Sequence, residues 1–327
     1  MKAVVIEKQG GVENLSWRDW PDPELRSHDA LVEVRAVGLN HLDVFVRRGM
    51  PGFPVQMPHI SGGDIAGVIK AFGSEVQGWS IGQRVVLHPM TDEGMMGEDF
   101  QGGMAEMVRI PATNLVPIPD DMDFVTAAAI PINFATALRM LHTIGDLKAD
   151  ELVLIIGASG GVGTAGIQLA KRAGARVIAV TRGPEKVASL RGLGADHVID
   201  MLQEDFSAAA WKLSGKKGVD LVLNYTGGDT WVPSLRALRK RGRLVTCGAT
   251  AGFNPPTDIR YIWSRELKVL GSNGYTQQDV AQSVALCASR AIRPLVSHVL
   301  KPWQAIEAHL MLEDRKVIGK VVLDFAS

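Results

Sequence analysis

The sequence predicts an α/β protein of two domains, in which a doubly wound parallel sheet accompanies a second, mainly β domain. A chain of 327 residues is about twice the usual length of one domain. From about residue 152 onward, apolar strand patterns alternate with helical patterns. A glycine-rich turn, Gly157–Gly163, stands between the first of these strands and a helix.

The first 120 residues or so show short strand patterns separated by turn residues. Apolar residues at 30–37 surround Glu33 and Arg35, and Gly82-Gln83-Arg84 introduces the apolar stretch 85–87. Glycines at 62, 63 and 67 interrupt another apolar stretch, as expected where strands bend or bulge. This part of the chain is therefore predicted to form the small β domain.

The middle of the chain predicts a parallel sheet covered on both faces, because strands and helices alternate there. Helical patterns at 184–193 and 231–240 stop near Gly194 and Gly242. The predicted strands are 152–156, 176–181, 197–199, 219–223, 244–247 and 267–270.

The tail, from about Glu266, contains a helix-like stretch at 303–312 and an apolar strand at 317–323. We expect it to return to the first domain and complete it. The predicted domains are therefore 1–124 with 266–327, and 125–265.

Charge and cysteine content exclude several classes of protein. Lys and Arg number 35 and Asp and Glu also number 35, so the global basic field that nucleic-acid binding needs is missing. The local basic cluster at 236–243 is interpreted as solvated or interface charge. Two cysteines, Cys247 and Cys287, are too few for a disulfide framework and fit a reducing, cytoplasmic setting.

No membrane or targeting segment is predicted. The start of the chain has only four apolar residues, 3–6, before charged residues follow. The uncharged stretch 152–170 is as long as a membrane span, but its five glycines favour a strand, a turn and a helix.

The glycine turn predicts dinucleotide binding. The chain must turn sharply, let its N–H groups approach a pyrophosphate, and bring the positive end of a helix against the anion. On the G-x-G-x-x-G pattern, Ala158 takes the first glycine's place and Gly160 and Gly163 the others. The alternative is a tight structural turn. The predicted cofactor-binding residues of the turn are Ser159, Gly160, Gly161, Val162 and Gly163.

The end of the second strand of this unit favours NADP(H) over NAD(H). NAD enzymes place an acidic side chain on the ribose 2′-hydroxyl, whereas Thr181 stands here. Arg182 and Lys186 follow it and are suited to neutralise a 2′-phosphate. The alternative is that both are ordinary surface charges.

Eight ordered landmarks resemble the medium-chain dehydrogenase/reductase superfamily, in particular its quinone oxidoreductase-like and zinc-type alcohol dehydrogenase branches. The resemblance implies a GroES-like catalytic domain made from both chain ends, a Rossmann domain between them, and an active site in the cleft. It also implies a homodimer or homotetramer. The landmarks are Met1–Val5, Gly38–Asp43, Gly62–Gly67, Gly82–Val85, Ala127–Pro131, the glycine turn, Leu193–Asp196 and Gly319–Leu323.

The same resemblance predicts that no zinc is bound. The zinc branch would have a cysteine at Asn40, a His-Glu pair at Gly63-Asp64 and a Cys or Asp near Ile132. The cysteines of its structural zinc lobe are also absent from 88–103. Its proton-relay positions hold Leu42 and Phe45, which carry no proton. A different metal site, built from His41, His59 and His88, is the alternative.

For the remaining chemistry, Asn40 and Asp43 are the predicted catalytic residues. By resemblance Asn40 lines the substrate end of the cleft, where its amide N–H₂ would stabilise an oxyanion or enolate. Asp43 would support Asn40 without contacting the substrate itself. The alternatives are that Asn40 holds the turn after its strand and that Asp43 ties backbone amides.

The resemblance implies further cofactor contacts. Thr136 matches a residue beside the nicotinamide, although a helical Thr can equally bond its own backbone. His41 and Lys320 match residues near the pyrophosphate. Gly248 and Ser272 match positions where the carboxamide approaches the backbone. Met201 stands where many quinone reductases have a tyrosine on the 2′-phosphate.

Together these features predict a zinc-independent, NADPH-dependent reductase of quinones, enones or reactive carbonyls, with a small-molecule substrate as its partner. Two alternatives stay open: an alcohol dehydrogenase with an unusual metal site, and a catalytically silent NADPH-binding sensor or structural protein. The loop around Met90–Met96 is expected to shape the acceptor pocket.

Overall fold

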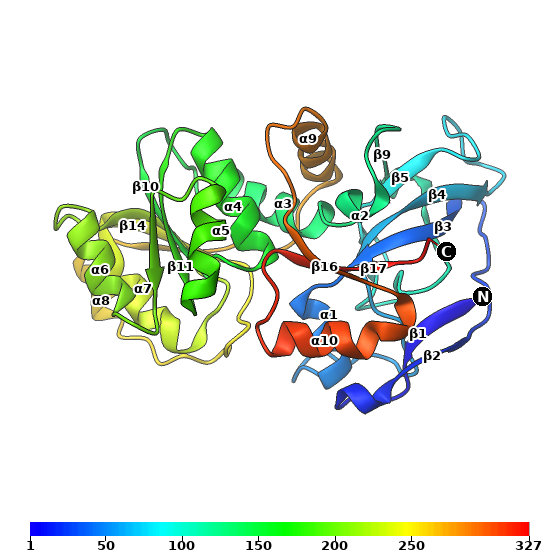
Figure 1. Ribbon diagram of the computed structural model, residues 1–327, viewed down its shortest axis with the longest axis horizontal. Coiled ribbons are helices and arrows are strands. Elements are labelled where there is room, and N and C mark those ends of the chain that lie inside the picture. The colour runs from blue at the N-terminus through cyan, green and yellow to red at the C-terminus, as the bar shows by residue number, and fades with distance from the viewer. Residues whose placement is uncertain (327) are drawn as a thin grey trace. The chain divides into compact units, whose positions relative to one another are not determined.

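The computed structural model describes residues 1–326 and divides into two compact units (Figure 1). Unit 1 contains Met1–Ile132 and the chain from Thr276 onward, and unit 2 contains Asn133–Tyr275. The boundaries predicted after residues 124 and 265 therefore lie eight and ten residues too early. The second difference arises because the strand Lys268–Gly271 pairs within the sheet of unit 2.

Unit 1 is built around a seven-stranded sheet of order β16-β17-β3-β4-β5-β9, with β8 also paired to β3. A close approach shapes its centre: a Cβ on Gly67 would lie 2.3 Å from the Glu33 carbonyl oxygen, where the β3–β4 register shifts. Its strands are β3 (Asp29–Gly38), β4 (Asp64–Phe72), β5 (Arg84–Leu87), β8 (Met107–Pro111), β9 (Leu115–Pro117), β16 (Val296–Leu300) and β17 (Lys320–Asp324).

Shorter elements complete this unit. Two small antiparallel sheets consist of β1 (Lys2–Ile6) with β2 (Leu15–Asp19), and of β6 (Met90–Thr91) with β7 (Gly94–Met95). Its α-helices are α1 (His41–Arg48), α2 (Phe124–Ala127), α9 (Gln277–Ala288) and α10 (Ala305–Glu313), and α3 (Pro131–Leu138) leads out of it. Single 3₁₀ turns lie at Val12–Asn14, Ala112–Asn114 and Pro302–Gln304.

Because β17 pairs with β3 and α10 packs against α1, the first and last parts of the chain share one core. In Figure 1 the blue and red ends of the colour scale accordingly meet in this unit. The return of the tail to the first domain is thus observed. The helix there begins at Ala305 and the strand at Lys320, slightly later than their patterns predict.

Unit 2 is a doubly wound fold, which confirms the predicted fold class. Its six parallel strands have the order β12-β11-β10-β13-β14-β15, so the chain starts in the middle and winds outward in both directions. The strands are β10 (Leu152–Ile156), β11 (Arg176–Thr181), β12 (His197–Asp200), β13 (Val219–Leu223), β14 (Leu238–Thr246) and β15 (Lys268–Gly271). All five residues of β10 are buried, as a central parallel strand requires.

The helices of unit 2 differ from prediction at two places. The helix predicted at 184–193 is a 3₁₀ turn, Pro184–Lys186, followed by an α-helix at Val187–Gly192. The helix predicted to run to Lys240 ends at Ala237, because Leu238 adopts an extended conformation and pairs with Val219. The helices are α4 (Gly161–Arg172), α5 (Val187–Gly192), α6 (Phe206–Leu213), α7 (Trp231–Ala237) and α8 (Arg260–Ser264), with 3₁₀ turns at Pro184–Lys186 and Gly228–Thr230 and a π-helical segment at Arg139–Ile144.

Within residues 1–326, no helix has both the length and the apolar character that crossing a bilayer would require. The uncharged stretch 152–170 is divided between strand β10, the glycine turn and helix α4, as predicted.

Candidate active site

The glycine turn of unit 2 is a backbone cradle. Gly157 has φ +68°, where a side chain is rarely accommodated. A Cβ on Gly161 would lie 2.4 Å from the Asn133 amide, and a Cβ on Gly163 would lie 2.5 Å from the Ala158 backbone. Helix α4 begins at Gly161 after Gly160, with no side-chain cap on its first N–H groups. The turn therefore fits a pyrophosphate, which needs free N–H donors and close backbone approach.

Two hydroxyls at the carboxyl ends of the unit 2 strands are also free. Thr181 Oγ1 at the end of β11 and Ser272 Oγ after β15 are buried, and neither has a hydrogen-bond partner among the described residues. Buried hydroxyl groups are usually hydrogen-bonded, so each of these two is suited to form a hydrogen bond with a ligand atom. Ser272 was predicted to lie where the nicotinamide carboxamide approaches the backbone, and Thr181 was considered only because it is not acidic.

The other predicted cofactor residues of unit 2 have varied surroundings. Arg182 donates to Asp229 at 3.3 Å and remains partly exposed. Lys186 is buried, with its ammonium 3.8 Å from Glu185. Thr136 is buried in α3. Gly248 lies exposed two residues beyond β14, where an added Cβ would make only an ordinary 3.7 Å contact with the Tyr225 carbonyl oxygen.

A cluster of buried polar side chains is the candidate site of unit 1. β3 ends at Gly38, and α1 begins at His41 after its capping residue Asn40. The Asp43 carboxylate accepts the Asn40 N–H at 2.7 Å and the Gly62 N–H at 2.9 Å. Asp43 therefore fixes the start of α1 against the glycine loop before β4. His41 lies exposed in the first turn of the helix.

An ion pair lies at the centre of this cluster. Lys320 Nζ donates to Asp64 Oδ2 at 2.6 Å, to Asn40 Oδ1 at 2.8 Å and to the Leu39 carbonyl at 2.9 Å. Lys320 is 3% exposed and Asp64 is fully buried. Asn40 Nδ2 also donates to Asp64 Oδ2 at 3.0 Å, and the Ile132 N–H donates to Asp64 Oδ1 at 2.7 Å. We refer to Asn40, Asp64 and Lys320 as the Asn–Asp–Lys cluster.

The close packing of this cluster depends on a glycine. A Cβ on Gly38 would lie 2.4 Å from the Ala128 carbonyl oxygen and 2.9 Å from Lys320 Cε. Sequence reasoning noticed Asp64 only as a position where a zinc ligand is missing. The signals available in the sequence were an acidic residue that follows two glycines and precedes an apolar stretch, and a lysine that opens an otherwise apolar strand.

Burial raises the pKa of the Asp43 carboxyl to about 6, against the opposing effects of the Asn40 N–H and the Lys320 charge, while Asp64 adds to the rise. Asp43, whose carboxylate accepts the Asn40 N–H, is thus a buried carboxyl group with a raised pKa.

The positions that the resemblance assigned to zinc ligands meet in space. Asn40 and Asp64 are hydrogen-bonded, and a Cβ on Gly63 would lie 3.2 Å from Ile132 Cδ1. Within residues 1–326, no three His, Cys, Asp or Glu side chains gather as a metal site would need. The absence of zinc stays a prediction that elemental analysis can test.

A narrow apolar pocket lies beside α1. The relay positions Leu42 and Phe45 line it, and the half-buried Glu98 is its one charged residue. Burial raises the pKa of the Glu98 carboxyl, and Asp99 raises it further. The remaining lining residues are Val46, Met50, Phe53 and Val55. Met96, from the predicted methionine loop, is instead fully buried in the core.

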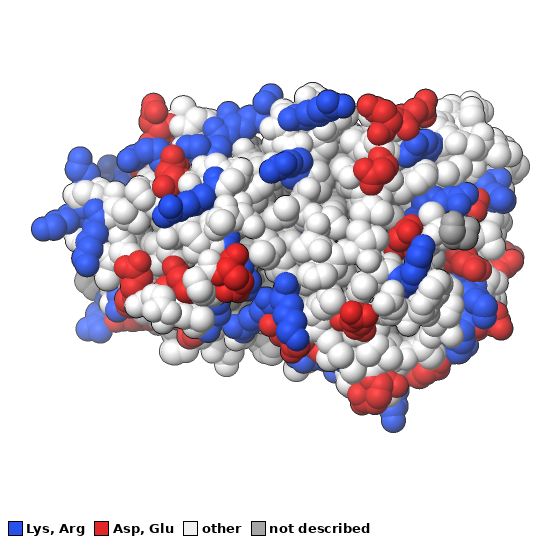
Figure 2. Space-filling model, in the orientation of Figure 1, with Lys and Arg blue, Asp and Glu red and all other residues white. Residues whose placement is uncertain are grey.

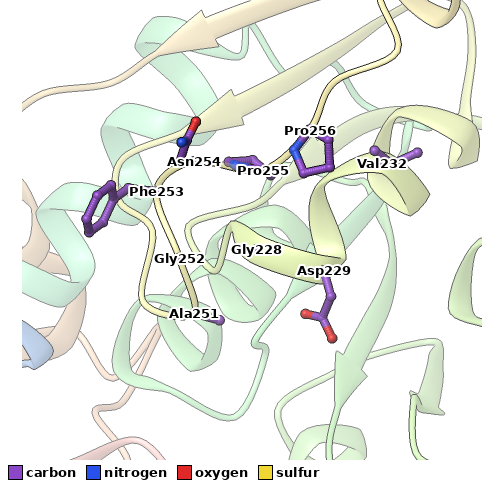
Figure 3. Close-up of a pocket in the computed structure, with 9 residues that line it drawn as sticks. All are labelled: Gly228, Asp229, Val232, Ala251, Gly252, Phe253, Asn254, Pro255 and Pro256. Carbon is purple, nitrogen blue, oxygen red and sulfur yellow. The ribbon is translucent and has the colours of Figure 1, made fainter.

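A larger cavity of about 610 Å³ lies in unit 2, beyond the ends of β13 and β14 (Figure 3). Its walls are the start of α7, with Gly228, Asp229 and Val232, and the loop 251–256. The Gly228 N–H donates to the Gly252 carbonyl at 2.8 Å and joins the two walls. In Figure 3 Pro255 and Pro256 lie on the Val232 side, whereas the Asp229 carboxylate points away from them.

The basic cluster at 236–243 is neutralised by acidic partners. Arg236 pairs with Asp205, Arg239 with Asp220, and Arg243 with Glu151, while Lys240 and Arg241 both pair with Glu266. Positive and negative side chains likewise lie side by side over much of the face in Figure 2. These contacts are consistent with the interpretation of the run as solvated or interface charge.

Two family descriptions match the chain. Residues 26–120 match the alcohol dehydrogenase GroES-like domain, and residues 161–289 match the zinc-binding dehydrogenase family. The first match lies within unit 1, and the second covers most of unit 2 and extends to residue 289 of unit 1.

Three curated relatives are similar over most of the chain. Crotonyl-CoA carboxylase/reductase of Cereibacter sphaeroides is 32% identical, over 88% of this chain and 77% of the relative. Acryloyl-coenzyme A reductase of Metallosphaera sedula is 30% identical over 99% of both chains. A 2-haloacrylate reductase from a Burkholderia species is 30% identical over 98% of both.

Solved structures are similar over the full length. An NAD-dependent alcohol dehydrogenase is 34% identical with a TM-score of 0.93, over 100% of both chains. A mycobacterial quinone oxidoreductase is 28% identical with a TM-score of 0.83, over 99% of both chains.

Proposed function

The chain belongs to the medium-chain dehydrogenase/reductase superfamily of oxidoreductases, and on that premise we propose that it reduces a carbon–carbon double bond conjugated to a carbonyl group, with NADPH as reductant. One observation carries the choice of substrate. Crotonyl, acryloyl and 2-haloacrylate groups, the substrates named for three relatives, all contain such a bond. The expected substrates are small unsaturated acyl thioesters, acids and enones.

NADPH, when bound, supplies a hydride to the carbon β to the carbonyl. The π electrons of the carbon–carbon bond would shift to the bond between the α-carbon and the carbonyl carbon, and those of the carbonyl group to its oxygen. A proton from solvent would then add to the α-carbon and restore the carbonyl group, leaving NADP⁺ as the oxidised product. The protein has to hold the cofactor, orient the acceptor and stabilise the negative charge on that oxygen.

The backbone cradle at 157–163 and the start of α4 are the groups that would hold the pyrophosphate. The free hydroxyls of Thr181 and Ser272 fit polar atoms at the two ends of the cofactor. Arg182 would bind the 2′-phosphate in place of Asp229, because a phosphate dianion is the stronger partner for a guanidinium.

Asn40 is proposed to donate to the carbonyl oxygen of the acceptor. One Nδ2 hydrogen points to Asp64, and the contact of the other with the Gly38 carbonyl is long, 3.4 Å. A stronger acceptor would replace that contact at little cost. A well-placed donor of this kind stabilises a developing oxyanion by about 2.7–4 kcal/mol.

Leu42 and Phe45 stand at the positions that would relay an alcohol proton in the zinc branch, and neither side chain has a proton to relay. This favours an activated acceptor over an unactivated alcohol. Quinones are the second candidate class, since a quinone also conjugates a carbonyl with a double bond and the chain resembles a solved quinone oxidoreductase.

The test is NADPH oxidation with a panel of acceptors: crotonyl-CoA, acryloyl-CoA, 2-chloroacrylate, a benzoquinone, an aldehyde and, in the reverse direction, an alcohol. We expect turnover with the conjugated acyl compounds, and deuterium from 4-deuterated NADPH at the β-carbon of the product. Turnover confined to the benzoquinone or to the aldehyde would reject the proposed substrate class. Zinc-dependent alcohol oxidation would favour the metal alternative, and tight NADPH binding without turnover would favour the silent protein.

A further inference from the structure

We propose that Lys320 is a positioning residue for Asn40 and does not bind the cofactor's pyrophosphate, the role that resemblance alone suggests for it. The inference rests on the proposed function, because the role of Asn40 in that function gives the lysine its effect.

The first argument is the number of donors. A lysine ammonium has three N–H groups, and Lys320 Nζ has three acceptors at hydrogen-bond distance, one each from Asp64, Asn40 and Leu39. All three belong to unit 1. A pyrophosphate would have to displace one of them.

The second argument is the cost of releasing the ammonium. Lys320 is 3% exposed and its partner Asp64 is fully buried. Removal of one member of a buried ion pair leaves the other charge without compensation, which is strongly unfavourable. Among the described residues, the Asp64 carboxylate accepts one hydrogen bond from outside the cluster, that of the Ile132 N–H. The Lys320 ammonium therefore stays paired with Asp64.

The third argument concerns the orientation of the Asn40 amide. Its Oδ1 accepts from the Lys320 ammonium at 2.8 Å, and its Nδ2 donates to the Asp64 carboxylate at 3.0 Å. A flipped amide would place its N–H₂ against a cation and its oxygen against an anion. The ion pair thus fixes which end of the amide carries the hydrogens.

The same contact makes Asn40 a better donor. A charge-assisted hydrogen bond to the amide oxygen polarises the amide and strengthens the hydrogen bonds that its N–H₂ group makes. The Nδ2 hydrogen weakly bound to the Gly38 carbonyl at 3.4 Å is the one left for a ligand. Lys320 would act on the acceptor carbonyl only through Asn40.

The experiment compares NADPH affinity with turnover. In the double variant Lys320→Met/Asp64→Asn, no buried charge is left unpaired. We expect its Kd for NADPH, measured by nicotinamide fluorescence, to stay within threefold of that of the unaltered protein. At saturating NADPH, kcat with crotonyl-CoA should fall by about 10²-fold, the effect of losing an oxyanion donor. A Kd raised tenfold or more, with kcat recovered at saturating NADPH, would overturn the proposal.

Two further variants keep the test decisive. Lys320→Arg retains the charge but not the three-directional donor set, so kcat should fall while the Kd for NADPH is kept; this variant also serves if the double variant does not fold. Combining Asn40→Ala with the double variant should lower kcat no further than Asn40→Ala alone, since both act through one amide. Additive losses would show that Lys320 acts independently of Asn40.

Lys316→Met is the matched control, because this exposed lysine pairs with Asp314 in the same segment and touches no part of the cluster. It should change neither quantity. Failure of the proposed function would appear separately, as absence of turnover by the unaltered protein. The Kd comparison would still decide whether Lys320 binds the pyrophosphate.

Discussion

Arg47 Nε donates a hydrogen bond of 3.4 Å to His309 Nδ1, and both side chains are buried. The Arg47 guanidinium also donates to the Gly10 carbonyl at 2.7 Å and to the Glu313 carboxylate. Through these contacts α10, near the end of the chain, is joined to α1, which starts beside Asn40. The geometry of the candidate site therefore depends on a connection at the opposite end of α1.

Arg47→Met should destabilise the protein by about 3–5 kcal/mol, because Glu313 would lose the buried member of its ion pair and the half-buried Gly10 carbonyl would lose its donor. Urea unfolding monitored by circular dichroism measures this loss. The matched control is Arg48→Met, which removes an exposed arginine from the same Glu313 and should cost less than about 1 kcal/mol. Equal losses in the two variants would contradict the importance of the buried contacts.

The stability of unit 1 should fall as the solution is acidified, through His309. Burial, and then the charge of Arg47, lower the pKa of His309 to about 3. A base whose pKa is lower in the folded state contributes its full stability above the unfolded pKa of about 6.5, and loses it as the pH falls toward 3. The slope is up to about 1.4 kcal/mol per pH unit. In His309→Gln this contribution to the slope of unfolding free energy between pH 6.5 and 4 should be absent.

Asp43 should contribute with the opposite sign. Its folded pKa of about 6 is raised above the usual value of about 3.9, so the protonated form is favoured by folding. Its contribution to stability is therefore largest below pH 4 and is lost as the pH rises to 6. Asp43→Asn should remove this pH-dependent contribution to stability. The variant keeps only one acceptor oxygen, so it also loses one of the two hydrogen bonds from the Asn40 and Gly62 N–H groups. Unfolding free energies at pH 4, 5, 6 and 7 would show it, and an unchanged pH slope would contradict it.

Gly163→Ala should abolish measurable NADPH binding, because its Cβ would lie 2.5 Å from the Ala158 backbone and force the cradle open. Gly166→Ala, in the same helix, is the control: its Cβ would meet Ile155 Cδ1 at an ordinary 3.4 Å. Fluorescence titration with NADPH compares them. Retained affinity in Gly163→Ala would show that the cofactor does not use this turn.

Arg182→Ala should weaken NADPH binding about tenfold or more and leave NADH binding within twofold, if this guanidinium binds the 2′-phosphate. Asp229→Asn should have the reverse effect, since it releases Arg182 from its ion pair. The measurement is the dissociation constant of each variant for NADPH and for NADH. A parallel change for NADPH and NADH in Arg182→Ala would assign Arg182 another role.

The sequence predicted those features that depend on neighbouring residues. Strands β10, β11 and β13 have the bounds that their apolar patterns indicate, and the glycine turn joins strand to helix as its spacing requires. The helix at 231–240 ended early because the pairing of Leu238 with Val219 is a tertiary effect. A helical pattern alone does not contain that information.

The candidate site was less accessible to sequence reasoning, for a related reason. Asn40 and Asp43 were selected as a local motif, and their contacts are local. The partnership of Lys320 with Asp64 joins residues 256 positions apart, and it arises only when β17 pairs with β3. The residues next to Lys320 in the sequence do not identify Asp64 as its partner, and those next to Asp64 do not identify Lys320.

The placement of β17 in the sheet of β3 also affects how the protein is made. During synthesis, Asn40 and Asp64 emerge from the ribosome long before Lys320, and unit 2 can fold in the interval. The sheet of unit 1 lacks β17 until the last of its strands has been translated. A nascent chain would thus carry a finished unit 2 and an unfinished unit 1. Reductase activity would begin only after translation has passed the final strand.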